Sequence, residues 1–353
     1  PYTAVAAGAR GLVFTSRNRL DSPEPVHEMR AEALELLNLE LSLIEPWACA
    51  AEPLGEATAS DRSIRVAVLA TERARLLMAM REAPGSQYVA PSGTVEEVSF
   101  VIPGVPESHS AYHLTTTGFR PLRHRRVAGG MRVTLSEFAS TGLIVLTQDP
   151  LAVIDLARRV AATSARAARL VHSLARRRLT LVKNIQQTQF RRATLVTAPA
   201  QKLLPQAESH LRNGEQLLAR QDAEGARRST DMALAALRQV QRLHWENAPP
   251  GLASPVTNPF RTSFAALPSS WLFADRVNSA SRGPNLLVGG DFENLQQMVQ
   301  AGWQHRSHHD HTVFTDVELS PVDPQSNKSA LRIRALPARP DAAPLVIETP
   351  PVW

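Results

Sequence analysis

The sequence predicts a multidomain α+β protein, and the spacing of its apolar residues changes three times along the chain. Residues 1–50 combine one continuous apolar run with one helical pattern, residues 51–150 show short alternating runs, and residues 151–246 return to helical spacing. The 353 residues suffice for two or three domains, and a hydrophobic content of 43% is typical of a globular chain. We therefore expect separate β-rich and helical regions.

Charge and cysteine content exclude several classes of protein. The 39 Lys and Arg residues exceed the 33 Asp and Glu residues by too little to indicate nucleic-acid binding, so we expect no specific nucleic-acid partner. The single cysteine, Cys49, excludes an intramolecular disulfide and any cysteine-based zinc or iron–sulfur site. No apolar run approaches the roughly 18 residues needed to span a bilayer, so we expect no transmembrane segment.

Residues 1–50 predict one strand followed by one helix. Val5–Phe14 is a continuous run of small and apolar residues, as in a buried parallel strand. Apolar residues then recur at helical spacing, and Pro46 is expected to end the helix. Such a unit cannot cover both of its own faces, so we expect the upstream part of the same chain to be its partner. The chain begins without Met, and we therefore expect a piece of a longer protein.

Residues 51–150 predict an Ig-like antiparallel β-sandwich. Short apolar or alternating runs are separated by clusters of Gly, Pro and Ser, which is typical of a sandwich of about 100 residues. The expected strands are Ile64–Leu69, Val95–Ile102, Ala111–Thr117, Arg132–Leu135 and Leu143–Leu146.

Residues 151–246 predict a helical domain with one long helix and a helical hairpin. The long helix is expected to reach about residue 196, and the hairpin to comprise 200–220 and 224–246, with the turn at Asp222–Gly225. Its inner face is expected to hold Leu211, Leu217, Leu218, Ala226, Met232, Leu234 and Leu237. Residues 247–284, rich in Pro and Ser, form a connecting segment.

The long helix carries a stripe of basic residues and, between 151 and 195, only one acidic residue, Asp155. At 100° per residue, most of these bases lie opposite the apolar positions. The stripe is either the solvated face of a packed helix or a surface that binds polyanions through Arg166, Arg169 and Arg176. Its members are Arg158, Arg159, Arg166, Arg169, Arg176, Arg177, Arg178, Lys183, Arg191 and Arg192.

Residues 285–353 contain three stretches that resemble the opening of a galactose-binding-like jelly roll, the fold of many carbohydrate-binding modules. These stretches are Asn285–Glu293, Ala301–Trp303 and Ser329–Ile333. The resemblance implies a first strand at Asn285, a structural calcium near Asp291 and Glu293, and Trp303 as an anchor of the core. Alternatively, the two carboxylates cap a turn, and Trp303 is a platform on which a sugar stacks.

His305, His308, His309, Asp310 and His311 form the densest group of possible metal ligands in the chain. They can bind zinc or nickel, or they can form a polar loop between strands. A loop of this kind beside Trp303 can also contact a sugar, and we expect carbohydrate contacts from Trp303, His305, His308 and His309.

The upstream stretches resemble the last β/α unit of a glycosidase-like (β/α)8 barrel, here truncated to residues 1–50. They are Ala7–Phe14, Leu37–Leu41 and Pro46–Trp47, and residues 51–150 are similar to the sandwich that follows such barrels. The resemblance places Ser16, Arg17 and Asn18 at the rim of an active site. None of these three is a carboxylic acid, and glycoside hydrolysis generally needs two, so we assign no catalytic residue.

These resemblances imply the C-terminal accessory region of a carbohydrate-active, glycoside hydrolase-like bacterial protein. The region would support a catalytic barrel and bind a polysaccharide or glycan. The alternatives are a non-catalytic scaffold of the cell surface or envelope, and a polyanion-binding module that uses the basic helix. We expect export to the periplasm, the cell surface or the medium, and no cofactor apart from a structural calcium in the jelly roll.

Overall fold

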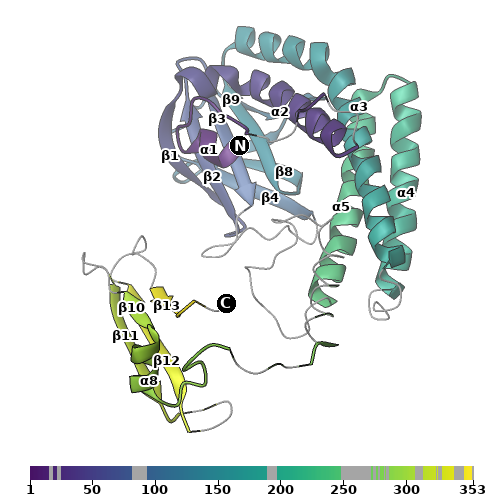
Figure 1. The fold of residues 1–353 in the computed structure, drawn as a ribbon. Coiled ribbons are helices and arrows are strands. Elements are labelled where there is room, and N and C mark those ends of the chain that lie inside the picture. The colour runs from purple at the N-terminus through teal and green to yellow at the C-terminus, as the bar shows by residue number, and fades with distance from the viewer. Residues whose placement is uncertain are drawn as a thin grey trace. The chain divides into compact units, whose positions relative to one another are not determined.

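The structure, a computed structural model, divides into two compact units, Pro1–Asp275 and Arg276–Trp353, and each is described by itself (Figure 1). It describes residues 1–15, 19–21, 25–81, 94–188, 197–247, 286–306, 313–322, 328–337 and 346–351, with single positions at 272, 276, 279–281, 283 and 324. Mixed helix and sheet bear out the α+β class. No helix among these residues is long and apolar enough to cross a membrane.

The first unit is built on one nine-stranded sheet in which every neighbouring pair is antiparallel, in the order β6-β5-β9-β3-β2-β1-β4-β8-β7. The two outer strands, β6 and β7, are consecutive in the chain and separated only by Leu122, so the sheet curls until it nearly closes into a barrel. The strands are β1 Glu52–Ala59, β2 Ile64–Ala70, β3 Arg75–Arg81, β4 Val95–Ile102, β5 Ser110–Leu114, β6 Phe119–Pro121, β7 Arg123–Val127, β8 Gly130–Phe138 and β9 Thr141–Thr147.

Successive side chains of the central strands point to opposite faces of the sheet, and each face packs in a separate hydrophobic core. In β3, Leu77 faces a core shared with β4 and β8, whereas Leu76 and Met78 face a second core on the other side of the sheet. Helices cover that second side, so β3 is buried on both faces and reads as a continuous apolar run. Strand β8 is buried on one face and alternates. The antiparallel β-region agrees with the prediction. The Ig-like sandwich of two sheets is wrong, because the described strands of this region form a single curled sheet.

The strand predicted over Val5–Phe14 is wrong. Helix α1 (Tyr2–Ala6) begins the chain, and Gly8, with φ +94°, ends it in a Schellman motif with hydrogen bonds from Gly8 N–H to Val5 O and from Ala9 N–H to Ala4 O, both 2.9 Å. Alanine favours a helix, and the left-handed glycine then stops it. The described residues of 1–50 therefore form two helices and no β/α unit.

Helix α2 (Pro25–Ala50) continues through Pro46, so the prediction that Pro46 ends it is also wrong. A proline cannot donate to the carbonyl four residues earlier, here that of Ser42. Arg159 donates to the Ser42 carbonyl instead, at 3.4 Å, and Arg10 donates to the carbonyls of Ala48 (2.9 Å) and Ala51 (3.0 Å) at the helix end. Burial of the last turns against the sheet holds the helix together.

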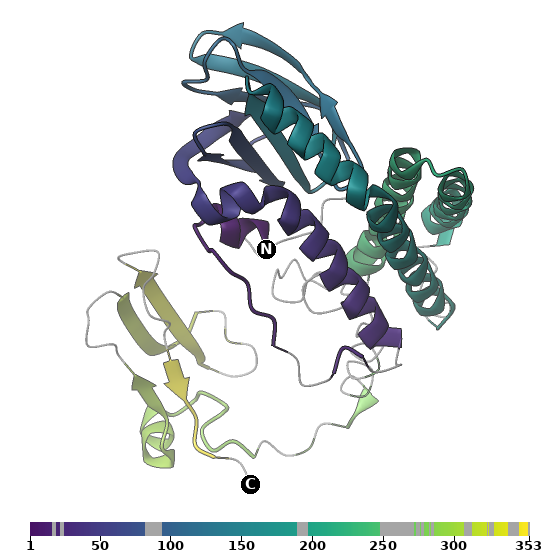
Figure 2. The same cartoon turned by 90° about the horizontal axis from the view of Figure 1, so that it is seen from above.

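The apolar face of α1 and α2 is covered by this chain's own sheet. Leu43, Ile44 and Trp47 lie in one core with Leu76 and Val145. The expectation that the upstream chain must cover this face is therefore wrong, because β2, β3 and β9 do so (Figure 2).

Three long helices follow among the described residues of the first unit: α3 (Pro150–Thr188), α4 (Thr197–Ala219) and α5 (Ala223–Asn247). The beginning of α3 covers the sheet through Leu156 and Val160, and its second half packs on α4 and α5 through Ala175, Val182 and Ile185. The described helix ends at Thr188, and Arg191 and Arg192 lie outside the described residues. The α4–α5 hairpin lies where the pattern placed it, except that Met232 is 54% exposed and not on the inner face.

The second unit holds a short helix and two small antiparallel sheets. Helix α8 (Leu295–Ala301) precedes β10 (Gln304–Arg306), which pairs with β13 (Val346–Glu348), while β11 (Val313–Ser320) pairs with β12 (Ala330–Pro337). The strand expected from Asn285 is wrong, since Leu286–Glu293 forms turns. Gly289, with φ +73°, makes the turn, and a Cβ there would lie 2.8 Å from Met298 Cγ.

Candidate functional site

The site predicted in the second unit is centred on the indole of Trp303, which lies between two turns. Gly302 ends α8 with φ +100°, and Trp303 follows it with its backbone N–H bonded to Met298 O at 3.1 Å. The Trp303 Nε1–H donates to Val288 O at 2.8 Å. Phe292 lies edge-on to the indole, with ring centroids 5.6 Å apart and an interplanar angle of 71°. Trp303 is thus fixed in place and partly buried.

The backbone of Phe292 adopts a strained conformation. Its φ is +58°, in the left-handed region that a bulky side chain rarely adopts. Its backbone N–H bonds to Gly289 O at 3.2 Å, which closes the turn. Strain of this kind persists only where the surroundings fix it, and here it brings an aromatic ring against Trp303.

The three residues that follow Trp303 in the chain have polar side chains. Gln304, His305 and Arg306 form β10 and are all exposed, and Arg306 makes an ion pair with Glu348 of β13 at 2.8 Å. Of the predicted histidine group, the structure describes His305, which is exposed on β10 two residues after Trp303. His308, His309, Asp310 and His311 lie outside the described residues, and their role stays a prediction.

The two carboxylates predicted near calcium hold backbone groups in place. Asp291 accepts the Glu293 N–H at 3.5 Å, and Glu293 Oε1 accepts the N–H groups of Lys328 (2.9 Å) and Ser329 (3.2 Å) at the start of β12. In the part of the chain that the structure describes, no three His, Cys, Asp or Glu side chains come together as metal ligands. The structural calcium stays a prediction.

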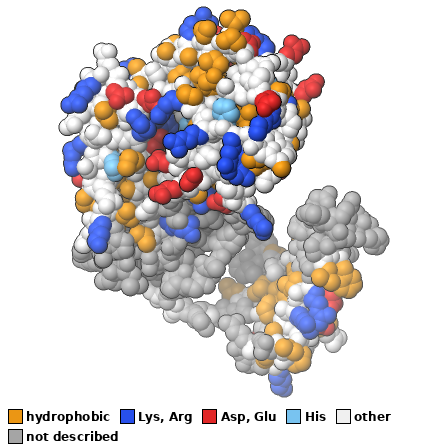
Figure 3. Space-filling model, turned by 180° about the vertical axis from the view of Figure 1, so that it is seen from behind, with side chains coloured by type: hydrophobic (Ala, Val, Ile, Leu, Met, Phe, Trp, Pro, Cys, Tyr) orange, Lys and Arg blue, Asp and Glu red, His pale blue; other side chains and the backbone are white. Residues whose placement is uncertain are grey.

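The basic stripe of α3 is largely paired with acids of neighbouring helices. Arg166 makes a bidentate pair with Glu35, at 2.6 and 2.5 Å, and Arg177 bonds to Glu28 at 2.9 Å and Glu32 at 3.2 Å. The partners of α3 come from α2 in reverse order, because the two helices run antiparallel. Figure 3 accordingly shows basic and acidic side chains intermixed on the face it presents.

The three arginines predicted to bind polyanions differ in their surroundings. Arg166 is compensated by Glu35 as described, whereas Arg176 lies 3.7 Å from Glu215 of α4, at the limit of an ion pair. Arg169 has no ion-pair partner among the described residues. Only part of the stripe therefore keeps uncompensated charge.

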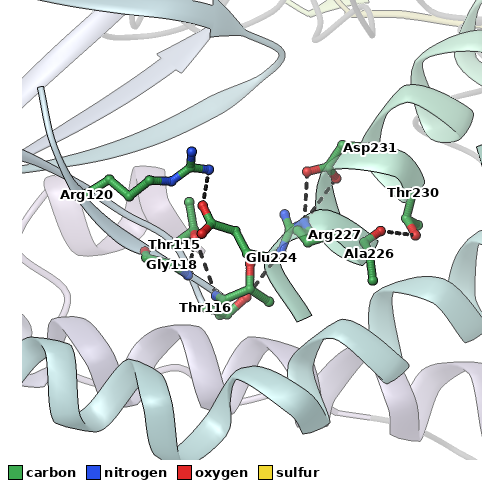
Figure 4. A network of polar contacts seen from close by, with 10 residues as sticks. Thr115, Thr116, Gly118, Arg120, Glu224, Ala226, Arg227, Thr230 and Asp231 are labelled. Atoms are coloured by element: carbon green, nitrogen blue, oxygen red, sulfur yellow. Dashed lines mark hydrogen bonds and ion pairs between the residues drawn. The ribbon is translucent and has the colours of Figure 1, made fainter. Parts of the chain in front are cut away.

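A second polar group, which the sequence did not reveal, joins the β5–β6 turn to the first turns of α5 (Figure 4). Arg227 donates to Thr116 Oγ1 at 3.2 Å and to both carboxylate oxygens of Asp231, at 3.0 and 2.9 Å. Arg120 of β6 makes an ion pair with Glu224 of α5. A Cβ on Gly118 would lie 2.9 Å from Glu224 Oε1, so the carboxylate packs directly against the turn.

Titratable groups in this region have shifted pKa values with identifiable causes. The Tyr2 hydroxyl donates to Glu40 Oε2 at 2.9 Å. Burial raises the pKa of Glu40, while the charge of Arg227 acts in the opposite direction. Burial, followed by the nearby Glu40, raises the pKa of Tyr2 well above its ordinary value. Burial and the charges of Arg120 and Arg227 lower the pKa of His113 in β5 to about 4.

Such clusters of shifted pKa values occur at functional sites and also in structural ion networks. Here the charged side chains are engaged with one another and with the hydroxyl groups of Tyr2 and Thr116, and they join α1, α2 and α5 to the β5–β6 part of the sheet. No short motif signals it, because its members come from distant parts of the chain.

No protein-family model matches the chain, and no curated protein matches it in sequence. One similar solved structure is the alpha-L-fucosidase isoenzyme 2 from Paenibacillus thiaminolyticus, with 8% sequence identity and a TM-score of 0.22. The match covers 27% of this chain and 15% of the fucosidase chain. A likeness this slight defines neither the fold nor the function.

Proposed function

We propose that the chain is a carbohydrate-binding accessory region of a carbohydrate-active protein, and that the surface around Trp303 binds the glycan. The observation that carries the proposal is a fixed, partly exposed indole followed directly by the exposed polar strand Gln304–Arg306. A sugar presents apolar C–H faces and hydroxyl groups, so its site needs an aromatic surface beside hydrogen-bonding side chains.

The resemblance of Ala301–Trp303 and Ser329–Ile333 to stretches of a galactose-binding-like jelly roll supports this role. Phe292 and Val288 fix the indole, so little conformational entropy is lost when a ligand stacks on it. Affinity remains weak, roughly millimolar to micromolar, because each sugar hydrogen bond replaces one to water. A glycan-binding region of this kind acts outside the cytoplasm, and export belongs to the proposal.

The test uses the 353-residue chain on a glycan array, followed by calorimetry with the best ligand. Trp303→Ala should lower affinity at least about tenfold, and Trp303→Phe, which keeps an aromatic face, should retain most of it. His305→Ala should weaken binding by a smaller factor, since it removes a polar contact only. His124→Ala, an exposed histidine of the first unit, is the matched control and should leave affinity unchanged.

Two outcomes would contradict the proposal. An array without any ligand would favour the scaffold role, and equal affinity in Trp303→Ala and the wild type would remove Trp303 from the site. Hydrogen exchange of β10 to β13 in each variant shows whether the second unit remains folded. A loss of binding counts only where that exchange is unchanged.

A further inference from the structure

A cavity of about 390 Å³ lies on the second half of α3, in the first unit. Its lining is almost entirely basic or hydroxylic and comes from one face of α3 with one leucine of α4. The residues are Arg169, His172, Ser173, Arg176, Arg177, Thr180 and Leu218. The cavity thus gathers part of the basic stripe into a concave site.

His172 is buried in the wall of this cavity without a hydrogen-bond partner. It is 6% exposed, and neither of its ring nitrogens has a partner among the described residues. Gly214 of α4 lies against it, and a Cβ there would be 3.3 Å from His172 Nδ1, so the ring is enclosed. Burial, with Arg176 acting in the same direction and Glu215 against it, lowers the pKa of His172. An imidazole this buried normally has a partner.

The charges around the cavity are not balanced. Arg177 is compensated by Glu28 and Glu32, and the Ser173 hydroxyl also donates to Glu32, at 2.9 Å. Arg169 has no acidic partner in the described part of the chain, and Arg176 has only Glu215 at 3.7 Å. These two guanidinium groups, about two helical turns apart on α3, thus line one cavity with spare hydrogen-bonding capacity.

We propose that this cavity binds a tetrahedral oxyanion, a sulfate or phosphate group carried on a small organic molecule such as a sugar. Arg169 and Arg176 supply the charge, and an anion oxygen gives the buried His172 the partner that it lacks. The volume falls in the range of about 300–1,000 Å³ typical of small-molecule sites, which leaves room for more than a bare ion. The site is separate from Trp303 and does not depend on glycan binding there.

The experiment titrates the full chain with sodium sulfate, sodium phosphate, glucose 6-sulfate and glucose 6-phosphate at constant ionic strength. The His172 imidazole signal, assigned by its loss in His172→Gln, should shift saturably with each. The sugar esters should bind at least about threefold more tightly than the free ions. Constant ionic strength removes general screening from the comparison.

Arg169→Gln/Arg176→Gln should weaken binding of each probe at least about tenfold. The control is Arg158→Gln/Arg228→Gln, which removes the same charge from exposed positions outside the cavity and should leave affinity unchanged. All four arginines are exposed, so both double variants should keep the wild-type melting temperature in the absence of probe.

Non-saturating shifts, or equal losses in the two double variants, would overturn the proposal, because either result describes nonspecific attraction. Equal affinities for the sugar esters and the free ions would overturn the claim that the ligand carries an organic group. Glucose without sulfate or phosphate should cause no shift of the His172 signal, and a shift would also overturn the assignment. Failure of the glycan array would leave these results unaffected.

Discussion

Acidification should destabilise the first unit through His113. Burial beside Arg120 and Arg227 lowers its pKa from the ordinary 6.5 to about 4, so between these values the unfolded chain binds more protons than the folded one. The free energy of unfolding should therefore fall as the pH decreases from 6.5 to 4. At about 1.4 kcal/mol per pH unit, the loss is about 3 kcal/mol, a large share of the roughly 5–15 kcal/mol that stabilises a domain.

The perturbation that isolates this effect is His113→Gln, which keeps a neutral polar side chain and cannot gain a proton in this range. Urea denaturation followed by far-ultraviolet circular dichroism at several pH values between 7 and 4 gives the free energy of unfolding of each protein. The variant should lose about 3 kcal/mol less than the wild type over that interval. His124→Gln, at an exposed position, should behave as the wild type does.

Other groups titrate in the same pH range, and their contributions cancel when His113→Gln is compared with the wild type. Burial also lowers the pKa of His109 and His172, and both contribute equally to the wild type and the variant. The raised pKa of Glu40 acts with the opposite sign, since the folded state then holds the proton more tightly and stability falls as the pH rises through that range. Equal pH dependence of His113→Gln and the wild type would refute the reasoning.

Four further substitutions test the packing and the ion pairs. Arg227→Leu should cost about 1–3 kcal/mol by urea denaturation, because it removes the hydrogen-bond partner of Thr116 and Asp231 and the cation nearest to the part-buried Glu40. Leu76→Ala, at a position with no exposure, should cost about 2–5 kcal/mol in the same measurement. Arg166→Gln should change stability by less than about 1 kcal/mol despite its short bonds, because both partners are exposed. Gly289→Ala should speed hydrogen exchange in α8 and β10, since the turn has φ +73° and no room for a Cβ.

The sequence allowed the strands with apolar or alternating runs and the α4–α5 hairpin to be predicted closely, because in these regions local pattern and burial agree. Strand β3 was missed because Leu, Met and Ala also favour helices, and burial on both faces overrides that preference. The run Val5–Phe14 is no strand because its first two residues belong to helix α1, Gly8 ends that helix, and the residues that follow pair with no strand. Pro46 does not end its helix, because Arg159 of α3, which is distant in the sequence, donates to the Ser42 carbonyl that the proline leaves without a donor.

The candidate sites differ in how far they could be predicted. Trp303 and His305 are two residues apart in the chain, so a local pattern was enough to propose them together, and their role in binding stays a prediction. Glu28, Glu32 and Glu35 lie on one face of a helix at spacings of four and three, which could have indicated an acidic partner for the basic stripe. Nothing local indicates that Arg227 meets Thr116, because that contact depends on how α5 docks on the sheet.

The helices of the first unit are joined by two kinds of ionic contact with different consequences. The Arg166–Glu35 pair between α2 and α3 is exposed, so it adds little stability. The Arg177–Glu32 pair between the same helices is only partly exposed, and both pairs help to set the register of two long helices. Arg227 is part-buried and bonds to Thr116 as well as to the half-exposed Asp231, so breaking its contacts leaves polar groups without partners where α5 meets the sheet. Charge on α3 is therefore satisfied wherever α2 supplies an acid. At Arg169 and Arg176, where it does not, the same helix keeps the capacity to bind an anion from solution.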